Sequence, residues 1–99
     1  MKLVKSKTCR GFNLFEFTDL YGTKCNIQES SLATNCAIWI GADDPNPLIM
    51  ASKTKQGGTG WVKYYIPDDV IIHTRMHLSA KQVRELLPTL IKFAFLKRL

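Results

Sequence analysis

The sequence contains no long hydrophobic run, because charged or polar residues interrupt every apolar stretch within a few positions. A helix that spans a bilayer needs about 20 consecutive, predominantly apolar residues. We therefore expect no membrane span. Residues 1–7 are basic, but the apolar segment that a secretory signal requires does not follow them. These two absences favour a cytoplasmic protein.

Cysteine is scarce, and no two cysteines form a C-x-x-C pair. Cys9, Cys25 and Cys36 are an odd number at wide spacings, which is typical of reduced thiols rather than of a disulfide framework. A zinc site would need His73 or His77 as its fourth ligand, and the spacing matches none of the usual zinc modules. We expect no metal and no cofactor.

Motifs for catalysis are also missing. Ser30 and Ser31 do not lie in a G-x-S-x-G elbow, and the acidic pairs at 43–44 and 68–69 stand beside prolines, as turn residues do. The glycines at 57–60 lack the lysine and the helix that follow the glycines of a phosphate-binding loop. The sequence therefore predicts no catalytic residue and a protein that is not an enzyme.

Acidic residues are few: 8 against 14 Lys and Arg, for a formal net charge of +6. The excess is at the two ends, because the first ten residues and the last eight hold seven positive charges and no acidic residue, and the segment between them has a net charge of −1. One interpretation is a nucleic-acid-binding protein that uses these basic termini. Its candidate contacts are Lys2, Lys5, Lys7, Arg10, Lys92, Lys97 and Arg98.

The chain has the length of one domain, and we expect a single domain over residues 1–99. Residues 1–10 form a basic arm or a first strand. Residues rich in strand formers predict strands at 12–18, 23–28, 36–41, 48–51, 61–66 and 70–78. Asp19 and Gly22 occupy the first and fourth positions of a turn between the first two of these strands.

The C-terminal segment carries the clearest local signal. Ser79 and Gln82 have the spacing of a capping box at a helix N-terminus, and the helix should cover residues 79–97. Its apolar residues recur at helical spacing and form one stripe, at Val83, Leu86, Leu87, Leu90, Ile91 and Ala94. We predict an α+β fold, an antiparallel sheet of four to six strands with this helix packed on one face.

One strand face is the candidate binding site. In the segment 70–78, His73, Arg75 and His77 alternate with apolar residues and should share one side of a strand. Arginine makes planar bidentate contacts, and histidine changes its charge near neutral pH. Together with the aromatic residues Trp39 and Tyr64, this face suits the binding of a macromolecule, although a plain solvated face would show the same alternation.

A homodimer is also left open. About a hundred residues bury only a modest core, and Phe12, Leu14, Phe93 and Phe95 are apolar residues that the expected core does not use.

Several segments, taken together, point to a family. They are residues 17–22 (FTDLYG), 25–28 (CNIQ), 30–33 (SSLA), 38–41 (IWIG) and 74–79 (TRMHLS), followed by the leucine-rich helix. This combination resembles a family of short uncharacterised proteins encoded by bacteriophages and prophages. The resemblance implies a small cytoplasmic protein in an infected bacterium. We expect a non-enzymatic interaction protein that binds and modulates a host macromolecule, most simply a host protein.

Overall fold

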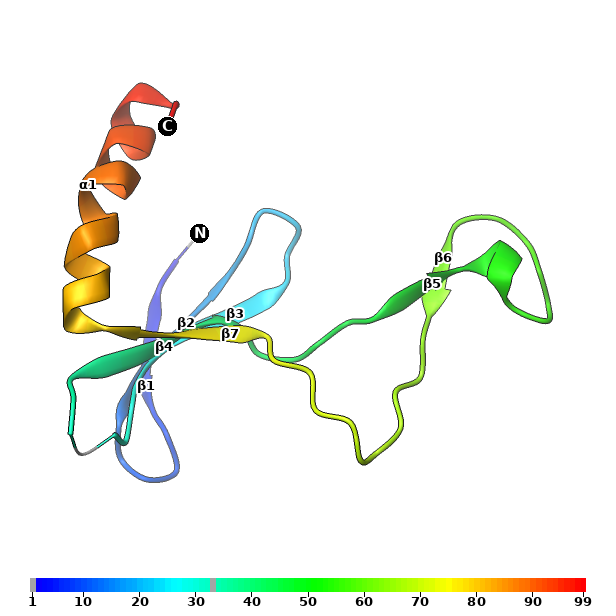
Figure 1. Ribbon diagram of the computed structural model, residues 1–99, viewed down its shortest axis with the longest axis horizontal. Coiled ribbons are helices and arrows are strands. Elements are labelled where there is room, and N and C mark those ends of the chain that lie inside the picture. The colour runs from blue at the N-terminus through cyan, green and yellow to red at the C-terminus, as the bar shows by residue number, and fades with distance from the viewer. Residues whose placement is uncertain (1, 33) are drawn as a thin grey trace. The chain divides into compact units, whose positions relative to one another are not determined.

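The computed structural model describes residues 2–32 and 34–99. Where we expected one domain, its contacts divide the chain into two compact units (Figure 1). The first comprises Met1–Asp43 and Arg75–Leu99, and the second comprises Asp44–Thr74. The predicted α+β class is confirmed: the first unit holds a five-stranded antiparallel sheet and the C-terminal helix. None of the helices in the described residues is both long and apolar enough to cross a bilayer.

The sheet of the first unit has the strand order β1-β2-β3-β4-β7. Its strands are β1 (Val4–Lys7), β2 (Asn13–Thr18), β3 (Lys24–Glu29), β4 (Ala37–Ala42) and β7 (Arg75–Ser79). The basic arm thus supplies a first strand, and the expected strands at 12–18, 23–28 and 36–41 agree with β2, β3 and β4 to within a residue or two. β1 and β7 are the two edges of the sheet.

The turn between β2 and β3 forms as its residues predict. The Asp19 carboxylate accepts hydrogen bonds from the backbone N–H groups of Tyr21 and Thr23, both at 2.9 Å. Gly22 has a φ of 81°, a value that glycine adopts without steric cost. These local contacts set the register in which Phe17 pairs with Cys25.

The register gives the sheet one polar face and one apolar face. The polar face carries Glu16, Asn26, Gln28, Trp39, Arg75 and His77. The opposite face, called the apolar sheet face below, carries Phe15, Phe17, Cys25, Ile27, Ile38, Ile40, Met76 and Leu78. Of these eight residues only Cys25 is buried, and Met76 is 59% exposed. The other six are partly buried, so the described residues of the first unit cover the apolar sheet face incompletely.

The helix α1 (Ala80–Leu96) begins where the sequence predicts, with Ser79 as its N-cap and Gln82 completing the capping box. Its expected packing across a sheet face is wrong. None of its residues, all of which the structure describes, is buried, and its substantial contacts are with β7. The physical reason is the connection: β7 ends at Ser79 and α1 starts at Ala80, so no loop exists that could turn the helix back over the sheet (Figure 1).

The second unit contains a two-stranded antiparallel sheet of β5 (Leu48–Met50) and β6 (Trp61–Lys63). A single 3₁₀ turn, η1 (Ala51–Lys53), follows β5, and Ala51 is buried. The expected strand at 70–78 is wrong over residues 70–74, which are not in a strand. Regular pairing begins only at Arg75, where β4 supplies a hydrogen-bonding partner.

Candidate functional site

Trp39 and His77 form the centre of a side-chain cluster on the polar face of the sheet. They are paired residues of the neighbouring strands β4 and β7, so their side chains project from the same face at the same height. Their rings stack with centroids 3.9 Å apart and an interplanar angle of 6°. Trp39 is half-buried and His77 is exposed, so the stack borders solvent.

Arg75 extends across β4 to join this stack. Its Nη1 donates a hydrogen bond of 3.0 Å to Oε1 of Gln28 on β3, and its Cζ lies 5.4 Å from the centroid of the Trp39 ring. The residue of β4 that pairs with Arg75 is Gly41. Because glycine has no side chain, the arginine can cross β4 at this point. The cation–π contact and the hydrogen bond together fix the guanidinium over the sheet.

His77 is held on its other side by Ser30. The His77 Nε2 and the Ser30 Oγ lie 2.9 Å apart in a hydrogen bond whose donor depends on the imidazole tautomer. Ser30 follows β3 directly, so the cluster draws on three neighbouring strands. We call these residues, Gln28, Ser30, Trp39, Arg75 and His77, the Trp39 cluster.

The structure brings together only part of the site expected from the sequence. Trp39, Arg75 and His77 meet in the first unit, whereas His73 and Tyr64 belong to the second unit, where both are exposed. Gln28 was missed, although it alternates with Lys24 and Asn26 on the polar side of its strand. Ser30 was missed because its role depends on the pairing of β3, β4 and β7, for which the sequence carries no local signal.

The two basic segments of the chain are connected to opposite edges of the sheet. Lys5 and Lys7 lie on the edge strand β1, and α1, which carries Lys92, leaves from the other edge strand, β7. Four strand spacings, about 19 Å, separate these edges. Lys92 Nζ donates to the Leu99 carbonyl oxygen at 3.0 Å. Lysine on an edge strand also has a plain structural use, since it discourages pairing with other sheets.

The surroundings of the Cys25 thiol lower its reactivity. All three cysteines are free. Burial, and then the Asp19 and Asp43 carboxylates, raise the pKa of the Cys25 thiol, which keeps it protonated and weakly nucleophilic. Within residues 2–32 and 34–99, no group of three or more His, Cys, Asp or Glu side chains is placed to hold a metal ion.

The Trp39 cluster therefore holds the Arg75 guanidinium and the rings of Trp39 and His77 in fixed positions beside solvent. A positive charge next to aromatic rings is suited to binding another molecule. Comparison with protein-family models, with curated proteins and with solved structures found no match for this chain.

Proposed function

We propose that this chain is a small non-enzymatic interaction protein that binds a host protein through the Trp39 cluster, in the manner of phage-encoded modulators acting in the bacterial cytoplasm. The observation that carries the proposal is the Arg75–Trp39–His77 stack, held in place by Gln28 and Ser30. Tryptophan and arginine are the residue types that contribute most to protein–protein affinity. Contacts that fix them before binding lower the entropic cost of association.

The cluster also suggests the chemistry of the partner. An arginine side chain has five N–H donors, and the hydrogen bond to Gln28 uses one of them. The guanidinium therefore keeps donors for a carboxylate, with which arginine forms its strongest hydrogen bonds. We expect the partner to present an acidic side chain beside an apolar or aromatic group that contacts Trp39 and His77.

The test is affinity purification of tagged protein from expressing cells, followed by measurement of the affinity for the recovered partner. Arg75→Ala and Trp39→Ala should each weaken binding at least tenfold, which is about 1.4 kcal/mol. Arg10→Ala is the matched control, because Arg10 is an exposed arginine in the turn between β1 and β2, and it should leave the affinity unchanged.

Two outcomes would contradict the proposal. In the first, the partner binds Arg75→Ala as tightly as the wild type. In the second, nucleic acid co-purifies in place of a protein and is released by salt or by substitution of Lys2, Lys5, Lys7 and Arg10, which would support the alternative that the basic termini bind nucleic acid.

A further inference from the structure

Two apolar surfaces of the first unit are covered only in part by the residues of that unit that the structure describes. One is the apolar sheet face, and the other is the apolar stripe of α1, where Leu86, Leu87, Leu90 and Ile91 are 44–58% exposed. A helix stripe and a sheet face of this kind normally cover each other in an α+β domain. Here only Val83, in the first turn of α1, lies beside Ile38 and Leu78 of the sheet face, and the stripe beyond it stays exposed.

The start of α1 is fixed in a direction that prevents this contact within the chain. Ala80, the first helical residue, donates its backbone N–H to the Cys36 carbonyl oxygen at 2.9 Å, which ties the helix to the beginning of β4. Ser79 and Gln82 bond each other's backbone N–H groups through the capping box. Because the helix follows the strand without a loop, its axis cannot reverse over the sheet from which it emerges.

The chain exposes more surface than a compact monomer of the same mass. The chain exposes 8585 Å², whereas a folded monomer of its mass, 11.3 kDa, exposes about 5,700 Å². The excess, about 2,900 Å² over both units of the chain, is larger than the roughly 800 Å² per partner that a standard complex buries. The chain therefore exposes enough surface for a homodimer interface.

The two surfaces also match in dimensions. A helix of 17 residues is about 25 Å long. The six-residue strands of the sheet are about 20 Å long, and the five strands span about 19 Å. One copy of α1 can therefore cover the apolar sheet face from end to end.

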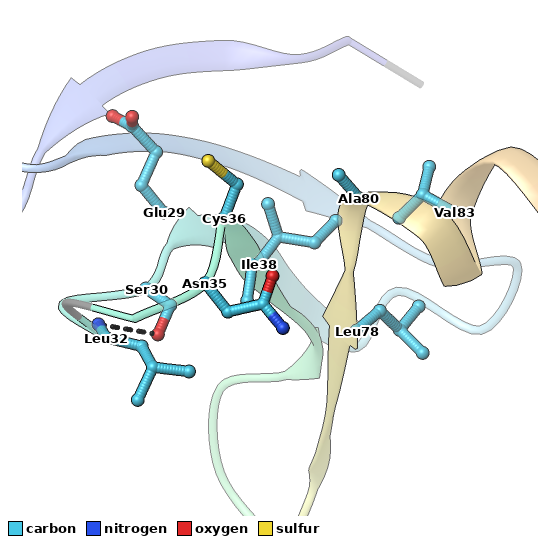
Figure 2. Close-up of a pocket in the computed structure, with 10 residues that line it drawn as sticks. Glu29, Ser30, Leu32, Asn35, Cys36, Ile38, Leu78, Ala80 and Val83 are labelled. Atoms are coloured by element: carbon cyan, nitrogen blue, oxygen red, sulfur yellow. Dashed lines mark hydrogen bonds between the residues drawn. The ribbon is translucent and has the colours of Figure 1, made fainter.

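A hollow at one end of the apolar sheet face supplies a place for the occupant (Figure 2). Ile38 and Leu78, paired residues of β4 and β7, line it together with Ala80 and Val83 from the first turn of α1. Leu32 and Cys36, from the segment between β3 and β4, form another side, together with the polar residues Glu29, Ser30 and Asn35. The hollow thus lies between the apolar sheet face and the first turn of α1. A helix from a second copy that packs on this face would pass over it.

We propose that two copies of this chain form a reciprocal homodimer in which α1 of each copy packs its apolar stripe on the apolar sheet face of the other. Such an isologous exchange covers both surfaces of both copies with a single two-fold axis. Of the Trp39 cluster, Trp39, Arg75 and His77 lie on the opposite face of the sheet and stay free, whereas Ser30 also lines the hollow. The dimer does not rest on the proposed function.

The experiment measures the mass of the full-length protein in solution by light scattering after size exclusion. The wild type should have twice the chain mass at micromolar concentration. Met76→Lys changes the centre of the apolar sheet face, and Leu90→Lys changes the centre of the helix stripe. Both residues are more than half exposed in the single chain, so each variant should fold, and each should raise the dissociation constant at least tenfold.

Two control variants introduce a lysine on the surfaces that the proposed dimer does not bury, namely the polar face of the sheet and the polar side of α1. Thr18→Lys lies on the polar face of the sheet, and Thr89→Lys lies on the polar side of α1. Both residues are exposed, and both variants should remain dimeric. Circular dichroism of all four variants checks that strand and helix content is retained.

Mixing the two defective variants provides the decisive measurement. A Met76→Lys chain keeps an intact helix and a Leu90→Lys chain keeps an intact sheet face, so their mixture should regain a dimer through one native contact. A monomeric wild type would overturn the proposal. So would a Met76→Lys variant that dimerises as well as the wild type, because the helices would then pair with each other rather than with the sheet.

Discussion

Trp39 and His77 stand directly opposite each other on β4 and β7, with ring centroids 3.9 Å apart and nearly parallel planes. This geometry predicts that the two residues are energetically coupled. In a double-mutant cycle of Trp39→Ala and His77→Ala, the coupling free energy of unfolding should be about 0.5–1.5 kcal/mol, measured by urea denaturation. A cycle of His77 with Leu20, which is 92% exposed in the β2–β3 turn, is the control and should give a coupling close to zero. A Trp39–His77 coupling as small as this control would show that the stack does not form in solution.

The Asp19 turn predicts a specific loss of stability. Asp19→Ala removes the acceptor of two backbone hydrogen bonds and should lower the free energy of unfolding by about 1 kcal/mol. Asp19→Asn keeps a side-chain oxygen in the same position and should restore most of this loss, as measured by thermal and urea denaturation. Equal stability of the alanine and asparagine variants would argue against the turn.

The thiols should differ in reactivity and in their effect at alkaline pH. Cys9 and Cys36 are exposed and Cys25 is buried, so a thiol reagent should label the first two quickly and Cys25 slowly. Because the pKa of Cys25 is raised in the folded protein, its thiol loses the proton at a lower pH in the unfolded chain. Cys25 therefore lowers the stability of the fold as the pH rises through the alkaline range.

Urea denaturation at neutral pH and at alkaline pH measures this effect. Cys25→Ala should reduce the loss of stability between the two conditions, whereas Cys36→Ala serves as a control on an exposed thiol and should not. The same pH dependence in the wild type and in Cys25→Ala would contradict the assignment.

Pro88 lies in the interior of α1 and lacks the N–H that would donate to the Arg84 carbonyl. Pro88→Ala should restore that hydrogen bond and increase the helical circular dichroism signal. Since proline costs about 3 kcal/mol relative to alanine in a helix interior, the stability gain can approach this value. Thr89→Ala, at the neighbouring position, should change stability by only a few tenths of a kcal/mol. Lower helicity in Pro88→Ala would show that the proline is needed for the path of the helix.

The residue types of the Trp39 cluster could be chosen from the sequence, but the contacts between them could not. Trp39, Arg75 and His77 could be selected from their residue types and from the alternation along one strand. Their partners Gln28 and Ser30 are each 47 positions away in the chain from the residues that they contact. His73 shares the alternation of Arg75 and His77 but lies outside β7, because pairing with β4 begins only at Arg75.

The sequence by itself determined the local features: the Asp19 turn, the Ser79 cap, the helix stripe and the alternation that divides each strand into two faces. These depend on hydrogen bonds and side-chain spacing over a few residues, which the sequence displays directly. The tertiary structure decided that β4 pairs with β7, that Arg75 crosses over Gly41, and that α1 leaves the sheet without covering it. Pairing and direction depend on contacts between distant segments and on the absence of a loop at residues 79–80, so hydrophobic patterning alone gave the right surfaces but the wrong contact between them.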